Sequence, residues 1–386
     1  SYEYSLLNRL MTQSRILWQY LAIIFFPSTS GVGLFHDIEI SLSLLSPMST
    51  LISVFFWLLV LTLAFICPGK QKILLLAILW YFAGHLIESS ILPLELFFNH
   101  RNYLAFLGFI FAIFYGFFKL LPDKILSAPL KITFAFVYVF ILLFQTISIS
   151  NLWRDPMKLS QSWYFDDSET VRNAELYAIT LANRDFDGML KAAKIYEDTF
   201  ALNPANFRLL LNRMNLSCSS SFISRPENLL IIQSLQQVDK ENRDLLSPLQ
   251  QLVSLTTSNV CNIYSPELLY SIISHIMTVM PEQSSGLYEF ELANLKFYTD
   301  NYDEGISLLQ SSYEHSGDPG VLFSLSLRLI NAGQYQEALA TINKGIDRLG
   351  HYNNIRTGTR DFKLNTLYQM RRDVLGFIAG ENDIVE

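Results

Sequence analysis

The side chains best suited to chemistry gather in residues 84–104, a polar stretch between two long apolar ones. Glu88 and Glu95 are seven residues apart, which on a helix places both carboxylates on one face. Arg101 suits a phosphate clamp, because its guanidinium gives paired hydrogen bonds and keeps its charge. His100 could donate to a phosphate or transfer a proton. The alternative is an interfacial loop whose charges simply face water.

Other catalytic motifs are missing from the sequence. It contains no Gly-x-x-x-x-Gly-Lys loop, no Gly-x-Gly-x-x-Gly, no His-Glu-x-x-His and no Gly-x-Ser-x-Gly. No cysteine pair has the spacing of a zinc site. We therefore expect neither a bound metal nor a cofactor.

Charge divides the chain into two parts. Residues 1–150 hold 8 basic and 6 acidic residues, a net charge of +2, whereas the remainder holds 20 and 29, a net charge of −9. The whole chain is 51% hydrophobic and 16% charged. An acidic soluble part is a poor partner for nucleic acid and for anionic lipid surfaces. We expect a membrane domain over residues 1–150, a soluble domain over 151–386, and no nucleic-acid partner.

The first part contains segments long and apolar enough to cross about 30 Å of hydrocarbon. A weaker apolar stretch, 16–26, is too short to span and predicts a re-entrant or interfacial helix, or the end of a longer one. The four predicted spans are 48–67, 73–88, 103–121 and 130–150.

The lysines orient these spans. They fall in two connections, between the first and second spans and around the loop between the third and fourth: Lys70, Lys72, Lys119, Lys124 and Lys131. Lysine-rich loops are cytoplasmic. The N-terminal segment, the polar stretch and everything after Ser150 are then extracytoplasmic, which for a bacterial inner membrane is the periplasm.

The second part predicts amphipathic helices with short breaks. Tyr302-Asp303-Glu304-Gly305-Ile306 recurs as Tyr335-Gln336-Glu337-Ala338-Leu339, an offset of 33 residues. A helical hairpin of about 34 residues is the tetratricopeptide signature. Small residues let paired helices approach, and neighbouring hairpins must stack to bury their faces. The fold expected is all-α: a bundle of about four transmembrane helices plus a re-entrant or interfacial helix, followed by an α-solenoid of tetratricopeptide-like hairpins.

An earlier helical pair, residues 174–204, looks like a similar hairpin, and 205–285 is helical by periodicity alone. Cys218 and Cys261 could pair in an oxidising compartment, but two buried free thiols are favoured. The repeats have two interpretations: a scaffold supporting a lumenal surface, or a groove that binds a protein.

The sequence resembles the GT-C-type multi-span membrane glycosyltransferases that carry tetratricopeptide repeats, namely the O-mannosyltransferase type and its bacterial protein-glycosylating relatives. Residues 10–20 are similar to a lumenal segment of that group, and 151–156 to its linker into the repeats. The matching positions of the polar stretch are Glu88, Ser89, His100, Arg101, Tyr103 and Leu104.

The resemblance implies a mechanism. A polyprenyl-phosphate-linked sugar enters from the membrane, and an acceptor protein or glycan comes from the extracytoplasmic side, possibly through the repeats. Arg101 would clamp the lipid phosphate, with Arg15 as a second candidate. His100 and Tyr103 would neighbour that phosphate and Glu88 would orient them, so that together they stabilise the departing phosphate.

The resemblance also implies that the general base lies upstream, in a first lumenal loop this chain lacks. We therefore expect the C-terminal portion of such an enzyme, and the catalytic base is unassigned. Asp37 and Glu39 are better explained as a solvated loop or an acceptor contact. Two alternatives remain: a non-enzymatic membrane-anchored scaffold for envelope or polysaccharide assembly, and an O-oligosaccharyl ligase or polymerase.

Overall fold

The computed structural model describes residues 5–25, 38–66, 72–86, 89, 96–97, 102–168, 170–238, 244–280, 282–351 and 357–379. These residues are helical apart from their connections, and their only β pairing is an isolated bridge between Ser43 and Ser46. The predicted all-α class is confirmed. The chain divides into two compact units, Ser1–Arg184 and Asp185–Glu386.

The boundary between the units differs from the boundary in composition. It follows Arg184, whereas charge and hydropathy change at residue 150. Two amphipathic helices, α6 (Pro156–Asp166) and α7 (Val171–Ala182), therefore group with the apolar part, because α5 (Ala128–Trp153) continues directly into α6 and α6 packs on α7. The helices of the predicted 174–204 hairpin both form, but the unit boundary falls between them.

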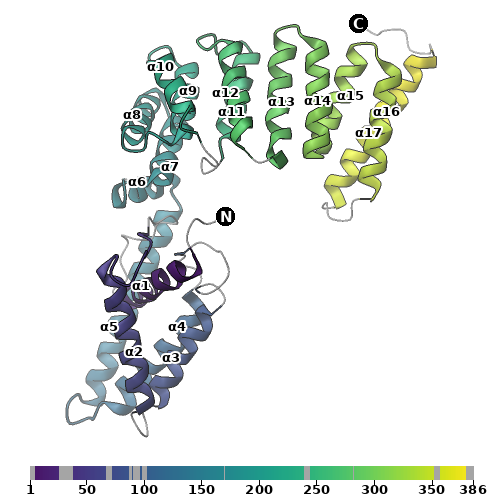
Figure 1. Cartoon of the computed structure of the whole chain (residues 1–386). Coiled ribbons are helices and arrows are strands. Elements are labelled where there is room, and N and C mark those ends of the chain that lie inside the picture. Colours follow the sequence, from purple (N-terminus) through teal and green to yellow (C-terminus); the bar gives the residue numbers. More distant parts are fainter. Residues whose placement is uncertain are drawn as a thin grey trace. The chain divides into compact units, whose positions relative to one another are not determined.

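The first unit is built from apolar helices and one crosswise helix (Figure 1). Helix α1 (Leu6–Phe25) lies across one end of α2 (Met48–Ile66), α3 (Lys72–His85) and α4 (Asn102–Tyr115). A π-helical turn, Gly116–Leu120, extends α4. Residues 16–25 of the predicted 16–26 helix therefore form the second half of a longer helix, because the polar first half of α1 continues the same buried face.

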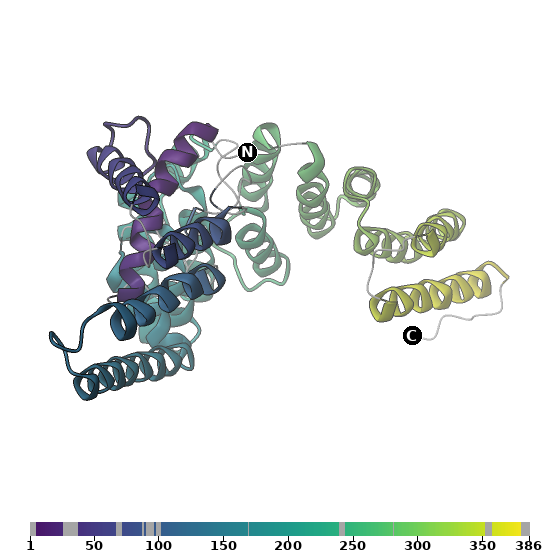
Figure 2. The same cartoon turned by 90° about the horizontal axis from the view of Figure 1, so that it is seen from below.

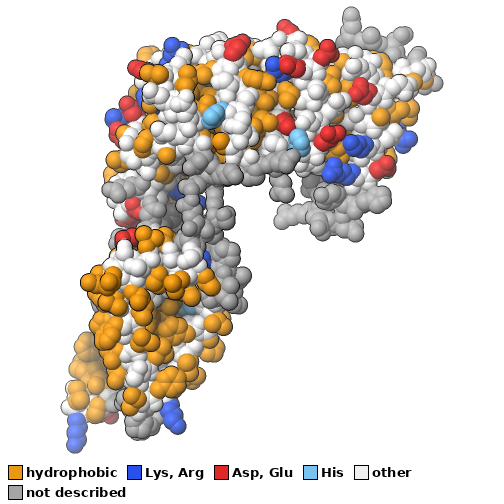
Figure 3. Space-filling model, in the orientation of Figure 1, with side chains coloured by type: hydrophobic (Ala, Val, Ile, Leu, Met, Phe, Trp, Pro, Cys, Tyr) orange, Lys and Arg blue, Asp and Glu red, His pale blue; other side chains and the backbone are white. Residues whose placement is uncertain are grey.

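Two helices of the described residues are long and apolar enough to cross a membrane: Asn102–Lys119 and Ala128–Trp153, with mean hydropathies of 1.5 and 2.2. The apolar stretches Met48–Leu63 and Leu75–His85 are shorter. Helix α3 has 14 residues, about 21 Å at 1.5 Å per residue. Length and composition thus support two of the four predicted spans. The visible face of this unit is mostly hydrophobic (Figure 3).

Aromatic side chains join α1 to the apolar helices. The Trp18 and Trp57 rings stack with centroids 4.3 Å apart. Trp57 Nε1 donates to the Ser14 carbonyl at 3.0 Å, and the Tyr81 hydroxyl donates to the Leu17 carbonyl at 2.7 Å. These bonds satisfy the polar tips of rings that are otherwise buried, so they fix α1 against α2 and α3.

Helices α3 and α4 cross closely because small residues meet at the crossing. A Cβ built on Gly84 would lie 2.8 Å from Ala105 Cα, and one on Gly108 would lie 2.9 Å from Trp80 Cβ. Small residues let helix backbones approach in this way within membranes. The crossing fixes the end of α3 beside the start of α4.

The second unit is a succession of helices that pack mainly on their neighbours along the chain. Figures 1 and 2 show α11 to α16 following one another in a row. The helices are α8 (Phe186–Leu202), α9 (Phe207–Ser219), α10 (Asn228–Leu235), α11 (Leu246–Thr257), α12 (Pro266–Val279), α13 (Glu282–Tyr298), α14 (Tyr302–Ser316), α15 (Pro319–Asn331), α16 (Tyr335–His351) and α17 (Thr357–Ala379).

The predicted offset of 33 residues matches two successive hairpins. Helices α14 and α16 begin at Tyr302 and Tyr335, and each packs on the helix before it. A Cβ on Gly305 would lie 2.6 Å from Phe297 Cε1. The glycine therefore lets α13 and α14 pack closely, as the repeat pattern predicts.

The two cysteines of the second unit are joined. Cys218 near the end of α9 forms a disulfide with Cys261 in the loop before α12, with Cα atoms 4.8 Å apart. The prediction of two free thiols is wrong. The spacing of 43 residues hides the pairing, because only the packing of α9 beside α11 brings the loop to Cys218.

Candidate functional site

The predicted site residues divide into two groups. Glu88, His100 and Arg101 lie outside the described residues. Arg15 and Tyr103 are described, one on α1 and the other in the first turn of α4. These two residues and the described parts of the polar stretch therefore define the geometry of the site.

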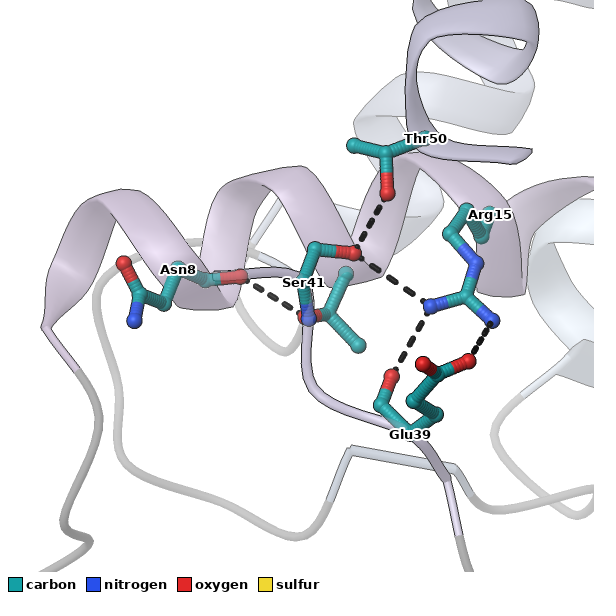
Figure 4. A network of polar contacts seen from close by, with 6 residues as sticks. Asn8, Arg15, Glu39, Ser41 and Thr50 are labelled. Carbon is teal, nitrogen blue, oxygen red and sulfur yellow. Dashed lines mark hydrogen bonds and ion pairs between the residues drawn. The ribbon is translucent and has the colours of Figure 1, made fainter. Parts of the chain in front are cut away.

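Arg15 binds the segment that precedes α2 (Figure 4). Its Nη1 donates to the Glu39 carbonyl at 2.8 Å and to Ser41 Oγ at 3.3 Å. Its Nη2 lies 3.8 Å from Glu39 Oε2, beyond hydrogen-bond length. The Arg15 side chain is 15% exposed and that of Glu39 is 68% exposed. One edge of the guanidinium thus holds the backbone, and the other faces a solvated carboxylate.

A chain of hydroxyl groups continues this network. Thr12 Oγ1 donates to the Asn8 carbonyl at 2.8 Å and accepts from the Ser41 backbone N–H at 2.9 Å. The Ser41 and Thr50 hydroxyls are 2.7 Å apart and both residues are buried (Figure 4). These bonds fasten the segment around Ser41 to α1 and to the first turn of α2, so Arg15 has a fixed partner.

The described parts of the polar stretch also contact α1 and α3. The Ser89 backbone N–H donates to the His85 carbonyl at 2.8 Å. Gln13 Nε2 donates to the Leu96 carbonyl at 2.9 Å. The Phe97 ring stacks on Tyr20 with centroids 4.7 Å apart. Helix α1 therefore holds the described part of the stretch on the same face that carries Gln13 and Tyr20, seven residues apart.

Tyr103 does not share this environment. Its side chain is 79% exposed, whereas its neighbours Asn102 and Ala105 are buried. Successive helix positions point about 100° apart, so Tyr103 faces outward where Asn102 faces the core. The structure does not bring Tyr103 together with Arg15.

His85 is a buried residue for which the sequence predicts no separate role. It is 2% exposed at the end of α3, with its ring parallel to Tyr20 and edge-on to Tyr81, at centroid distances of 5.4 and 4.6 Å. The signal in the sequence is a polar residue at the end of an apolar run, a place where such residues are costly unless they face a partner or a cavity.

The opposite end of the apolar helices carries a buried lysine that forms an ion pair with an aspartate. Lys131 is buried, and its Nζ donates to Asp123 Oδ1 at 2.8 Å and to the Leu121 carbonyl at 2.5 Å. Lys119 and Lys124 belong to the same connection. The basic residues of this end are thus separated along the helices from Arg15 and His85.

The linker after α5 is a capped turn. Asp155 Oδ1 accepts the backbone N–H groups of Lys158 and Met157 at 3.3 and 3.1 Å, and the Trp153 and Trp163 rings meet edge-on. These hydrogen bonds, led by that from Lys158, lower the pKa of Asp155. The Trp-Arg-Asp-Pro linker therefore has a structural role as the N-cap of α6.

The described residues contain no group of three or more metal-binding side chains. Their polar groups instead form hydrogen bonds around a buried aromatic core. A comparison of the sequence with protein-family models and with curated proteins finds no match.

Proposed function

We propose that this chain is part of a membrane glycosyltransferase that takes a sugar from a polyprenyl-phosphate-linked donor. The acceptor is a protein or a glycan on the extracytoplasmic side. The observation that supports this proposal is the placement of Arg15 and a buried polar face of α1 across one end of apolar helices. A substrate with a charged head and a hydrocarbon tail fits such a boundary between polar and apolar surfaces.

In the proposed membrane arrangement, α2 to α5 cross the bilayer and α1 lies at its extracytoplasmic surface. The direction of α3 and α4 supports this, since the end of α3 and the start of α4 meet beneath α1. Lys72, Lys119 and Lys124 then lie at the cytoplasmic end. The short helix α3 requires local thinning of the bilayer or flanking residues that extend to the interface.

The donor phosphate is bound by cations at this boundary. Among the described residues Arg15 Nη2 makes no hydrogen bond and lies 3.8 Å from Glu39 Oε2, and this edge of the guanidinium accommodates a phosphate oxygen. Arg101 acts as the main clamp, and His100 and Glu88 border the phosphate, whereas the outward-facing Tyr103 does not. Arginine retains its charge throughout and offers paired donors, so it stabilises the phosphate as it departs.

The disulfide supports an extracytoplasmic position for the second unit. Disulfides persist in oxidising compartments and are rare in the cytosol. A bond between Cys218 and Cys261 therefore fits the periplasm, the side on which the lysine rule places residues after Ser150. The helical hairpins of this unit then meet the acceptor.

Transfer assays on the full-length natural protein test the proposal. Arg101→Ala and Arg15→Ala should lower sugar transfer from a polyprenyl-phosphate donor by at least about tenfold, as expected for losing one charged hydrogen bond. Arg154→Ala, an exposed arginine at the end of α5, is the matched control. Unchanged transfer at normal protein level in both variants refutes the phosphate-binding roles.

The same assay separates the two alternatives. A scaffold predicts no transfer by the purified wild-type protein and normal partner recruitment by both arginine variants. A ligase or polymerase predicts transfer of whole oligosaccharides rather than single sugars. Product size, measured by mass spectrometry, distinguishes these outcomes.

A further inference from the structure

Two buried polar atoms at the junction of α1, α3 and α4 lack hydrogen-bond partners among the described residues. They are His85 Nε2 and Gln13 Oε1. Their residues are 2% and 3% exposed, respectively. Most buried polar atoms in proteins are satisfied, so each exception calls for an explanation such as a ligand.

The orientation of the Gln13 amide is fixed by its neighbour. Gln13 Nε2 lies 2.9 Å from the Leu96 carbonyl oxygen, which can only accept. The other amide atom is therefore an oxygen, and its missing partner must be a hydrogen-bond donor. His85 Nε2 can donate or accept according to the tautomer.

Aromatic rings connect the two positions. The His85 ring lies on Tyr20, Tyr20 lies on Phe97, and Phe97 follows Leu96, to which Gln13 is bonded. Gln13 and Tyr20 are separated by about 10 Å along α1. The junction is therefore a polar and aromatic site with one acceptor near one end and one imidazole near the other.

We propose that this junction binds the sugar of the lipid-linked substrate, with Gln13 and His85 as its hydrogen-bonding residues. The inference rests on the proposed function. A sugar hydroxyl can donate to Gln13 Oε1, and another can accept from or donate to His85 Nε2. The phosphodiester of the donor cannot fill both positions, because it carries no proton to offer the Gln13 oxygen.

Lipid binding to the full-length natural protein in nanodiscs tests this inference. The probes are undecaprenyl phosphate alone and undecaprenyl phosphate carrying a hexose or an N-acetylhexosamine. The test variant is His85→Phe, which keeps a ring on Tyr20 and Tyr81 but removes both nitrogens. His275→Phe on α12 is the matched control.

We expect the wild type to bind a sugar-bearing lipid more tightly than the bare lipid. His85→Phe should weaken binding of the sugar-bearing lipid about tenfold, the loss typical of one buried hydrogen bond, and leave binding of the bare lipid unchanged. His85→Gln, which can still form a hydrogen bond, should recover part of that loss. Melting temperatures of all variants show whether folding is retained.

Three outcomes would overturn the inference. If His85→Phe binds both lipids as the wild type does, His85 does not contact the sugar, and the proposed function is unaffected. If the variant weakens both lipids equally, its role is structural or concerns the phosphate. If the wild type binds neither lipid, the proposed function fails as well.

Discussion

At the scale of single residues, Glu291 shows how the second unit tolerates a buried charge. Its two carboxylate oxygens accept hydrogen bonds from Gln250 Nε2 at 3.1 Å and Asn294 Nδ2 at 3.4 Å. Burial raises the pKa of Glu291 above its ordinary value of 4.5, although these two bonds oppose the rise. The folded protein therefore holds a proton on Glu291 more tightly than the unfolded chain does.

This difference makes the stability of the chain depend on pH. Protonated Glu291 favours folding below about pH 4.5, and that contribution is lost as the pH rises from there through the raised pKa. Glu291→Gln should therefore be more stable than the wild type at pH 7, with the advantage disappearing near pH 4. Urea unfolding followed by circular dichroism measures the difference. Glu314→Gln, at an exposed site on α14, is the matched control.

A constant difference between wild type and Glu291→Gln from pH 4 to pH 7 would contradict this prediction. Lower stability of the variant at pH 7 would do the same, since it would mean that the ionised form is the better fit for the Gln250 and Asn294 donors.

At the scale of helices, the α3–α4 crossing positions the candidate site. In Gly84→Leu the new Cβ would lie only 2.8 Å from Ala105 Cα, so the two helices must separate. We expect a loss of about 1–3 kcal/mol, typical of overpacking, and weaker binding of any ligand beside His85. Gly116→Ala is the control, because a Cβ there meets nothing within 4 Å. Thermal unfolding in detergent measures both variants, and equal melting temperatures would show that the crossing tolerates the added bulk.

The sequence predicts helices well where a pattern is long and local. The apolar run that begins at Met48 gives α2, and the two Tyr-led repeats give α14 and α16. It underestimates α1, because Arg9, Thr12 and Gln13 are polar residues of types that are mostly exposed, yet they are buried in the helix. Their burial depends on segments distant along the chain, such as Leu96 for Gln13, which local periodicity does not reveal.

The candidate site is less predictable than the helices. The sequence predicts Arg15 as a phosphate ligand, and the structure adds its contacts with Glu39 and Ser41. The sequence predicts Tyr103 beside the same phosphate, yet Tyr103 faces outward, because the turn of α4 directs Asn102 to the core instead. The sequence predicts no role for His85, since a single histidine at the end of an apolar run carries no information about the Tyr20 ring packed on it.

At the scale of the whole molecule, the two units differ in where their apolar side chains lie. The first unit exposes large apolar side chains on α2, α4 and α5, including Phe55, Phe111 and Phe140, a surface that lipid would cover. The second unit holds clusters of buried apolar side chains between its helices and is crosslinked by Cys218–Cys261. The two units therefore suit different surroundings, which in the proposed function are lipid and an oxidising aqueous compartment.

The most direct test of this account is a topology measurement on the natural protein in bacterial spheroplasts. Single cysteines replace Leu45 before α2, Lys124 in the lysine-rich connection and Glu314 in the second unit, all exposed positions, with Cys67 removed and the Cys218–Cys261 pair kept. A membrane-impermeant maleimide should label positions 45 and 314 in intact spheroplasts, and position 124 only after permeabilisation. Labelling of 45 and 314 from opposite sides of the membrane, or of 124 together with 314, would contradict the account.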